Sequence, residues 1–525
     1  AGQVAAWLGV AVDPVRVVLE GLERQGRVTR GEFRPDGVER EWCDVDVLRQ
    51  LRRRCLAVLR KEVEPVDGTA LARFLPEWQG VGRPRRGVDA LAEVVGLLQG
   101  APLPASVLEA DILPARMAAY SPADLDALAT AGEVVWVGAG PLGTTDGRVR
   151  LLFRDQVGLL LPPTTDEPPA DPHHEALRAH LAGRGASFWP ELVVAAQEAN
   201  LDYDDATVLD ALWDLVWAGE VTNDSFAPLR ALAGAKRGKG AKAGSAGARR
   251  RPRPGRLTRI GPPEAAGRWS LVAPLLLSPA TPTEAAHARA QQLLHRYGVL
   301  TREAALGEGA EGGFAGVYPV LKALEERGHV RRGYFVEGLG AAQFALPGAV
   351  DRLRAVRSSL EQGHELHPVE ATALVLAATD PAQPYGASLP WPDADPSRDV
   401  LAPDLGALAP KSSAGADDPR AKSGPRGKAG PRPSRSAGAF VVLVDGEPAV
   451  FLERGGRSLV VFPAGRGDAL GAWAEALTRL VKDGRLRSLE IAKVDGAAAA
   501  EDPLVAGALR AAGFADGYRG LVFRA

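Results

Sequence analysis

The clearest chemistry that the sequence offers is recognition of a phosphate backbone by one short hairpin. Arg331 and Arg332 are followed two residues later by Tyr334. Two cations beside an aromatic ring can bind phosphates and stack on a base. The alternative interpretation is that Arg332 and Tyr334 alternate on the solvent side of a strand and bind nothing. The spacing alone favours neither interpretation.

Residues that could belong to a metal site or an ATPase are present, but their spacing does not match the motifs of either. His173, His174 and His180 lack the HExxH spacing of a zinc site, so solvated histidines are expected and no metal ligand is predicted. No GxxxxGK[ST] loop exists, because the Gly-Lys pairs at 238–239 and 427–428 are followed by Gly and Ala. We therefore expect no cofactor and no ATP hydrolysis in this chain.

The elements that must position the hairpin are helices that end in a repeated phrase. Leu-x-x-x-Gly-x-Val occurs at 22–28, 128–134, 215–221 and 324–330, with a near copy at 480–486. Each copy closes an amphipathic segment, its glycine can end the helix in a left-handed conformation, and its valine begins a strand. A long helix followed by two strands is typical of a winged helix. The intervals between copies are unequal, which excludes a fixed-period solenoid.

Length and composition predict several domains. The chain has 525 residues, of which 46% are hydrophobic and 24% charged, so three to five domains are expected. It has no apolar run of about 18 residues and no signal peptide, which predicts a cytoplasmic protein without a membrane partner. Cys43 and Cys55 are too far apart for a metal-binding CxxC pair.

Two basic stretches interrupt the chain. Residues 234–256 carry nine Lys and Arg and no acid, and residues 411–435 carry seven against two Asp. Both are rich in Gly, Ala, Pro and Ser, so they are predicted to be flexible linkers, acting either as tethers or as phosphate-binding arms. The remainder has a formal charge of −16. Its nucleic-acid contacts must therefore come from local basic patches.

The longer motifs around these modules resemble the Lhr family of bacterial DNA helicases. The resemblance is carried by RYGVLTREAA at 296–305, by the segment 312–354, by AATDPAQPYGASLPWP at 377–392 and by EVEPVDGTALARFLPEWQGV at 62–81. It covers nearly everything outside the basic stretches, and residues 171–233 are the least distinctive part. It implies a superfamily 2 motor upstream that uses ATP and Mg, and a role in DNA repair. It also implies a self-associating carboxyl-terminal region, similar to the AlkZ group of DNA glycosylases.

The similarity to AlkZ implies candidate residues for base excision. AlkZ-like proteins carry Gln, an aliphatic residue, then Gln or Asp, and the nearest counterpart is Trp78-Gln79-Gly80-Val81, which departs from that pattern two residues after Gln79. A glycosylase needs an amide or carboxylate near the sugar, so Gln79 is the catalytic candidate. Trp78 is either a stacking ring or a core residue. Gln343, in the fragment GAAQFA, either contacts nucleic acid or binds the backbone of its own strand.

The sequence thus predicts a mainly α fold with β wings: tandem winged-helix domains, then a small α+β, barrel-like module. The predicted winged helices span 1–60 (truncated at its amino terminus), 61–165, 171–233 and 269–402, the last of which also contains the start of the barrel-like segment. The predicted linkers are 234–268 and 403–437, and the predicted module is 438–525. The predicted function is to bind single-stranded or damaged DNA, or an RNA–DNA hybrid, and to assemble with the motor and with further copies. A DNA glycosylase and a purely structural oligomerisation scaffold are the alternatives.

Overall fold

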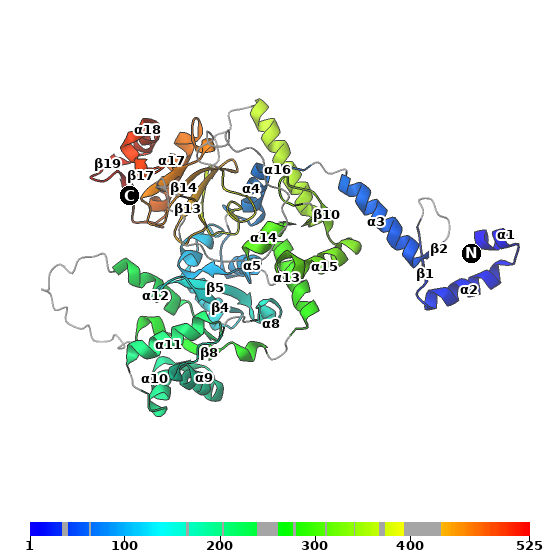
Figure 1. The fold of residues 1–525 in the computed structure, drawn as a ribbon, viewed down its shortest axis with the longest axis horizontal. Helices are drawn as coiled ribbons and strands as arrows, with labels where there is room; N and C mark the ends of the chain where they lie inside the picture. Colours follow the sequence, from blue (N-terminus) through cyan, green and yellow to red (C-terminus); the bar gives the residue numbers. More distant parts are fainter. Residues whose placement is uncertain are drawn as a thin grey trace, which may run out of the picture.

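Small antiparallel sheets packed against helices recur along the computed structural model (Figure 1). The structure describes residues 1–33, 40–61, 65–83, 85–163, 167–201, 204–238, 261–276, 280–309, 312–340, 342–366, 373–392 and 432–524. Most of the two predicted linkers lies outside these residues. No single described helix is long and apolar enough to cross a membrane, and only the bent pair α1 (Gly2–Leu8) and α2 (Val12–Arg24) passes such a test together.

The amino-terminal unit is a helix pair followed by a hairpin. After α1 and α2, β1 (Val28–Gly31) pairs antiparallel with β2 (Glu41–Asp44), and α3 (Val45–Lys61) follows directly. Gly26, at φ 71°, ends α2 in the left-handed conformation that the repeated phrase predicts. Figure 1 shows this unit set apart from the others and joined to them through α3.

The next unit, which α4 (Gly68–Trp78) precedes, is a winged helix. Its elements are α5 (Val88–Leu98), β3 (Leu103–Pro104), α6 (Ala105–Val107), α7 (Pro122–Thr130), β4 (Val134–Pro141) and β5 (Gly147–Phe153), and α8 (Val157–Leu160) follows. The sheet order is β3-β5-β4. The Ser121 side chain caps α7 and Gly132, at φ 75°, separates it from β4.

A second unit of this design packs against the first. Its elements are α9 (Pro172–Arg184), β6 (Ser187–Phe188), α10 (Trp189–Glu198), α11 (Asp205–Trp217), β7 (Val221–Asn223), α12 (Ala227–Gly238) and β8 (Arg268–Leu271). The sheet order β6-β8-β7 places β8 between two strands that precede the basic stretch. Strands from both sides of the predicted linker 234–268 therefore share one sheet, so this unit extends beyond the predicted bounds 171–233.

The unit that carries the predicted hairpin has the same order of elements. It consists of α13 (Pro282–Tyr297), β9 (Val299–Leu300), α14 (Arg302–Gly307), α15 (Gly313–Glu326), β10 (Arg331–Gly333) and β11 (Gln343–Ala345), and α16 (Pro347–Leu366) follows. The sheet order is β10-β11-β9. Thr281 and Glu284 form a capping box at the start of α13.

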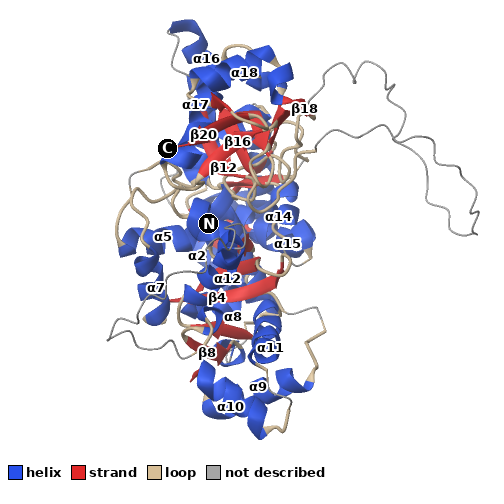
Figure 2. Cartoon of the chain, turned by 90° about the vertical axis from the view of Figure 1, so that its left-hand side faces the viewer, coloured by secondary structure: helices blue, strands red, loops and turns tan. Residues whose placement is uncertain are grey.

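The terminal module is α+β but does not close into a barrel. A six-stranded sheet has the order β12 (Ala373–Ala377), β13 (Phe440–Val444), β14 (Glu447–Leu452), β15 (Ser458–Val461), β17 (Lys493–Val494) and β18 (Ala497–Ala498). A second sheet has the order β16 (Ser488–Ile491), β20 (Leu521–Arg524) and β19 (Ala515–Asp516), beside α17 (Ala469–Lys482) and α18 (Pro503–Ala511). Figure 2 shows this module at one end of the molecule and α9 and α10 at the other. Because β12 pairs with β13, a strand from the 269–402 segment, where the sequence places the start of the barrel-like part, belongs to the sheet of this module.

Candidate nucleic-acid interface

The hairpin of β10 and β11 brings the predicted arginines and tyrosine together. Arg331 is half exposed, and its Nη1 lies 3.9 Å from Oδ1 of Asp351. Tyr334, with 40% of its surface exposed, accepts a hydrogen bond of 2.8 Å from the backbone N–H of Gly338. An ion pair this long between exposed groups is weak and screened by salt, so it leaves Arg331 able to exchange Asp351 for a phosphate.

Arg332 is held by aromatic rings. Its guanidinium carbon lies 5.6 Å from the ring centre of Tyr318 and 5.9 Å from that of Phe344, which is the cross-strand partner of Arg332. Such contacts orient the planar guanidinium without neutralising its charge. The strand therefore presents one exposed cation and one that aromatic rings orient, and both are donors suited to phosphate oxygens.

Gln343 shapes this hairpin from inside. The side chain is fully buried, and its Oε1 accepts hydrogen bonds of 2.9 Å from the N–H groups of both Phe335 and Val336. Its Nε2 donates to the carbonyls of Val336, at 2.8 Å, and of Leu339. The prediction of a nucleic-acid contact does not fit this position, because every polar atom of the side chain is used to fold the turn. The structure instead agrees with the alternative interpretation, in which Gln343 is a strand residue that hydrogen bonds to the backbone of its own hairpin.

Trp78 lies at the junction of α4 and α13. Its Nε1 donates a hydrogen bond of 2.9 Å to the carbonyl of His295, and the Arg352 guanidinium carbon lies 5.3 Å from its ring centre. The ring packs on Phe74, with ring centres 5.4 Å apart, and borders a cavity of about 770 Å³. Trp78 is thus half-buried interface packing with one edge at a cavity. Burial and the adjacent Arg296 lower the pKa of His295.

Gln79 is a structural residue in this fold. It is fully buried, its Nε2 donates a hydrogen bond of 3.1 Å to the carbonyl of Arg296, and its Oε1 accepts one of 2.6 Å from Nη2 of Arg116. The predicted catalytic role does not fit, because a side chain sealed among protein groups reaches no substrate. The amide instead joins α4 to the winged helices on both sides.

Arg116 and Asp380 form a buried ion pair next to Gln79. Nη1 and Nη2 of Arg116 donate to the two oxygens of Asp380 at 2.9 and 2.7 Å, and Nη1 also donates to the carbonyl of Ile112 at 2.9 Å. Neither side chain has more than 1% of its surface exposed. Arg435 donates to the backbone carbonyls of Asp380 and Gln383, and burial lowers its pKa. The end of the second predicted linker is therefore anchored in this network.

Sequence comparison places these units in a known family. Two family models, each described as "Large helicase-related protein, winged-helix domain", match residues 66–154 and 279–365 respectively. The Lhr helicase/probable uracil glycosylase of Mycolicibacterium smegmatis is 41% identical over 99% of this chain, and the Lhr helicase/uracil glycosylase of Escherichia coli K12 is 33% identical over 98%. The chain belongs to the large helicase-related (Lhr) family. It spans about a third (32%) of the length of both relatives.

A solved structure is also similar. DNA glycosylase AlkZ of Streptomyces sahachiroi matches with a TM-score of 0.42 and 14% identity, covering 82% of the Lhr chain and all of AlkZ. This likeness is too distant to assign residues or an activity.

One part of the candidate interface was not predicted from the sequence. In the Lhr chain α3 lies close to β10, and its consecutive Arg52, Arg53 and Arg54 are all exposed. The run of arginines is visible in the sequence, but its proximity to the hairpin depends on how two distant units pack. Arg52, Arg53 and Arg54 are therefore exposed cations on the helix that neighbours the hairpin of Arg331 and Arg332.

The histidines considered as metal ligands have other partners in the Lhr chain. His174 Nδ1 accepts a hydrogen bond of 3.1 Å from the N–H of Asp171, as part of a capping box for α9. His180 Nε2 lies 3.1 Å from Oγ of Ser187. Among the described residues no group of three or more His, Cys, Asp or Glu side chains is arranged to hold a metal ion.

Proposed function

We propose that this chain is the nucleic-acid-binding region of an Lhr protein. The observation that carries the proposal is the hairpin of the 279–365 winged helix, where Arg331 and Tyr334 are exposed and the half-buried Arg332 lies over aromatic rings. Positive charge placed locally on an otherwise acidic folded region suits phosphate contacts that position a strand without reading its sequence. The ligand is single-stranded or damaged DNA, with an RNA–DNA hybrid as a further substrate.

The hairpin variant tests this function. Replacing Arg331 and Arg332 together by alanine is expected to weaken binding of a fluorescein-labelled single strand by roughly tenfold, similarly for all sequences, because phosphate contacts are lost. The slope of log K against log salt should become shallower by about 1.4, which corresponds to two phosphates on a single strand. Fluorescence anisotropy measures both quantities.

A matched control removes the same charge elsewhere. Arg519→Ala with Arg524→Ala takes two exposed cations from the terminal module and is expected to leave affinity within about twofold, since distant charges are screened. Equal losses in the two double variants would show that net charge, and not the hairpin, governs binding. Unchanged affinity in the Arg331/Arg332 variant would remove the hairpin from the interface.

The wider setting is part of the same proposal. Both relatives are named as helicases, and this chain has no GxxxxGK[ST] loop, so we assign the ATP- and Mg-dependent motor to another part of the full-length protein. The region described above holds the strand while that motor moves, it assembles with further copies, and it acts in DNA repair in the cytoplasm.

Glycosylase activity is the second candidate, favoured by the names of the two relatives. Since Gln79 is buried and hydrogen bonded at both ends, we expect that Gln79→Ala would act through stability and not through chemistry. Uracil-containing and alkylated single strands should be incubated with the chain and assayed for abasic sites. The expected result is that abasic product forms and that its rate of formation per folded molecule is unchanged by Gln79→Ala. The absence of product on both substrates would reject this candidate.

A further inference from the structure

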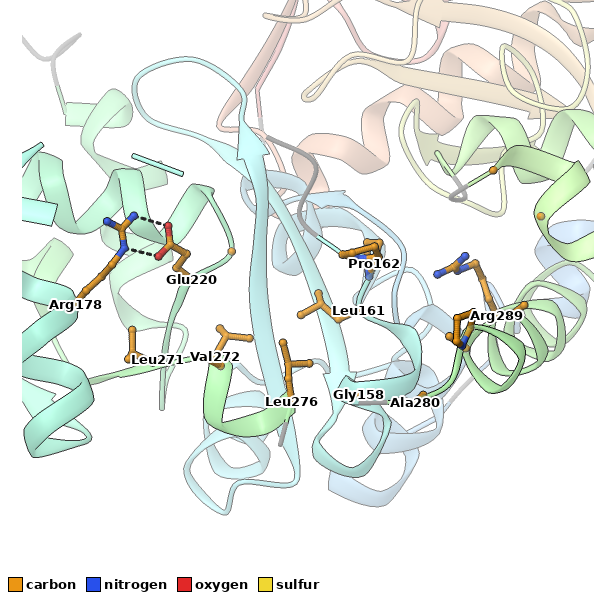
Figure 3. A pocket seen from close by; sticks show the side chains of 18 of the residues that line it. Gly158, Leu161, Pro162, Arg178, Glu220, Leu271, Val272, Leu276, Ala280 and Arg289 are labelled. Atoms are coloured by element: carbon orange, nitrogen blue, oxygen red, sulfur yellow. Dashed lines mark hydrogen bonds and ion pairs between the residues drawn. The ribbon is translucent and has the colours of Figure 1, made fainter. Parts of the chain in front are cut away.

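A cavity of about 870 Å³ lies where three units of the chain meet (Figure 3). Leu161 and Pro162 border it from the end of α8, Leu271 and Val272 from the end of β8, and Arg289 from α13. Cavities between domains in this range of volume are where proteins most often bind small ligands. None of the residues predicted from the sequence to bind nucleic acid lines it.

The wall of the cavity is apolar and open to solvent. Leu161, Val272 and Leu276 lie side by side along it in Figure 3, and Leu276 keeps 36% of its surface exposed. Exposed apolar surface in a concave site gains free energy when a flat apolar group covers it, at about 25 cal/mol per Å². The lining has no aromatic ring, so a ligand would pack against aliphatic groups.

Charged groups stand at the two sides of this wall. On one side Arg178 donates to both oxygens of Glu220, at 2.6 and 2.7 Å. On the other side lies Arg289, which Figure 3 shows across the cavity from that pair. Arg178 also donates to Glu175 and to the carbonyl of Pro169, so this pair is a fixed and internally neutralised part of the wall.

The Arg289 side of the cavity has an excess of positive charge. Arg289 also borders a small adjoining cavity whose ionisable lining groups are Arg150, Arg289, Arg296 and a single carboxylate, Glu308. Glu308 already pairs with Arg296 and accepts a hydrogen bond of 2.7 Å from the hydroxyl of Tyr297. Burial lowers the pKa of Arg150, with Glu308 opposing the shift and Arg289 adding to it. Arg289 is the cation on this side of the cavity that an anionic group would meet.

We propose that the cavity binds one nucleotide of a single strand, with the base against the wall of Leu161, Val272 and Leu276 and the phosphate at Arg289. The inference rests on the proposed nucleic-acid binding and deepens it by assigning a base-accepting pocket. An apolar body with an anionic group fits an apolar wall with one cationic end, and a nucleotide has both. The hairpin of β10 and β11 contacts the backbone, whereas this pocket takes a base.

The test compares strands that have bases with strands that do not. The probes are fluorescein-labelled dT12 and a 12-residue strand of abasic tetrahydrofuran units with the same phosphates. The wild-type chain should bind dT12 about tenfold more tightly, because the aliphatic wall covers apolar surface of a base and the abasic strand has no base to cover. Ala286→Trp, which fills the cavity from α13, should abolish this preference and leave the affinity for the abasic strand unchanged.

Two further variants ensure that the test of the pocket does not depend on Ala286→Trp alone. Leu276→Asp places a carboxylate on the exposed part of the wall and should also abolish the preference for dT12. Arg289→Ala should weaken the binding of both strands. Ala179→Trp, on the exposed face of α9 outside the cavity, is the control and should bind both strands as the wild type does.

The possible failures separate the two proposals. Equal affinity of the wild-type chain for the two strands, or an undiminished preference in folded Ala286→Trp and Leu276→Asp chains, would overturn the pocket assignment while leaving the hairpin interface in place. No binding of either strand by the wild-type chain would overturn the proposed function itself.

Discussion

Replacing Arg116 by alanine is expected to lower the free energy of unfolding by about 3–5 kcal/mol, because it leaves a buried carboxylate without its cation. Asp380 would keep only the hydrogen bond that its Oδ1 accepts from the N–H of Ala382, at 2.8 Å. Gln79 would lose the donor to its Oε1. The loss of stability should be largest at the junction that this network holds together. That junction consists of α4, the rest of the 66–154 winged helix and the segment that follows β12.

Thermal unfolding and protease sensitivity measure that effect, and a second variant controls for it. Arg116→Met combined with Asp380→Leu removes both charges and should recover much of the stability lost in Arg116→Ala, because replacing a whole buried ion pair by apolar groups is often nearly neutral. A full-sized loss in the double variant would mean that packing around Arg116, and not the unpaired charge, dominates. An unaltered transition in Arg116→Ala would show that the junction does not depend on this pair.

Trp136→Ala is expected to cost about 3–5 kcal/mol through the cavity that it creates. Trp136 in β4 is fully buried, and its ring centre lies 5.9 Å from that of Phe226 and 6.4 Å from that of Trp269 in β8. Its Nε1 donates a hydrogen bond of 3.1 Å to the carbonyl of Ser225. One side chain therefore links two winged-helix units, and both should become more sensitive to proteolysis when it is removed.

An exposed tryptophan provides the matched control. Trp7 keeps 85% of its surface exposed, so Trp7→Ala removes an equal side chain without creating a cavity and should change stability by no more than about 0.5 kcal/mol. If Trp136→Ala unfolded only the unit of α5 to β5 and left α9 to β8 protected, the shared core between the two units would be refuted.

The helix ends are where the sequence predicted the fold best. Gly132, Gly219, Gly328 and Gly484 have φ between 74° and 80°, and three of these four are followed by a strand that begins within three residues. This pattern is local, since a glycine that ends an amphipathic helix and a valine that begins a strand need only neighbouring residues to specify them. The hairpin with Arg331 and Tyr334 follows from the same local rules.

Pairings across long separations were not predictable. β7 pairs with β8 and β12 pairs with β13 across long stretches of sequence, and no local pattern identifies these partners. Gln79 shows the same limit for function: its resemblance to a catalytic pattern is local, but its role depends on Arg116 and Arg296, which are remote in sequence. Whether a polar side chain is buried and satisfied is a property of tertiary packing.

A salt titration of single-stranded DNA binding by the whole chain tests the central claim most directly. Phosphate contacts release counterions, so with roughly four phosphates held, log K should fall linearly with log salt at a slope of about −3. The slope should be the same for strands of different sequence. Binding that is absent at low salt, or an affinity that does not change as salt rises, would contradict the account and leave a structural scaffold in its place.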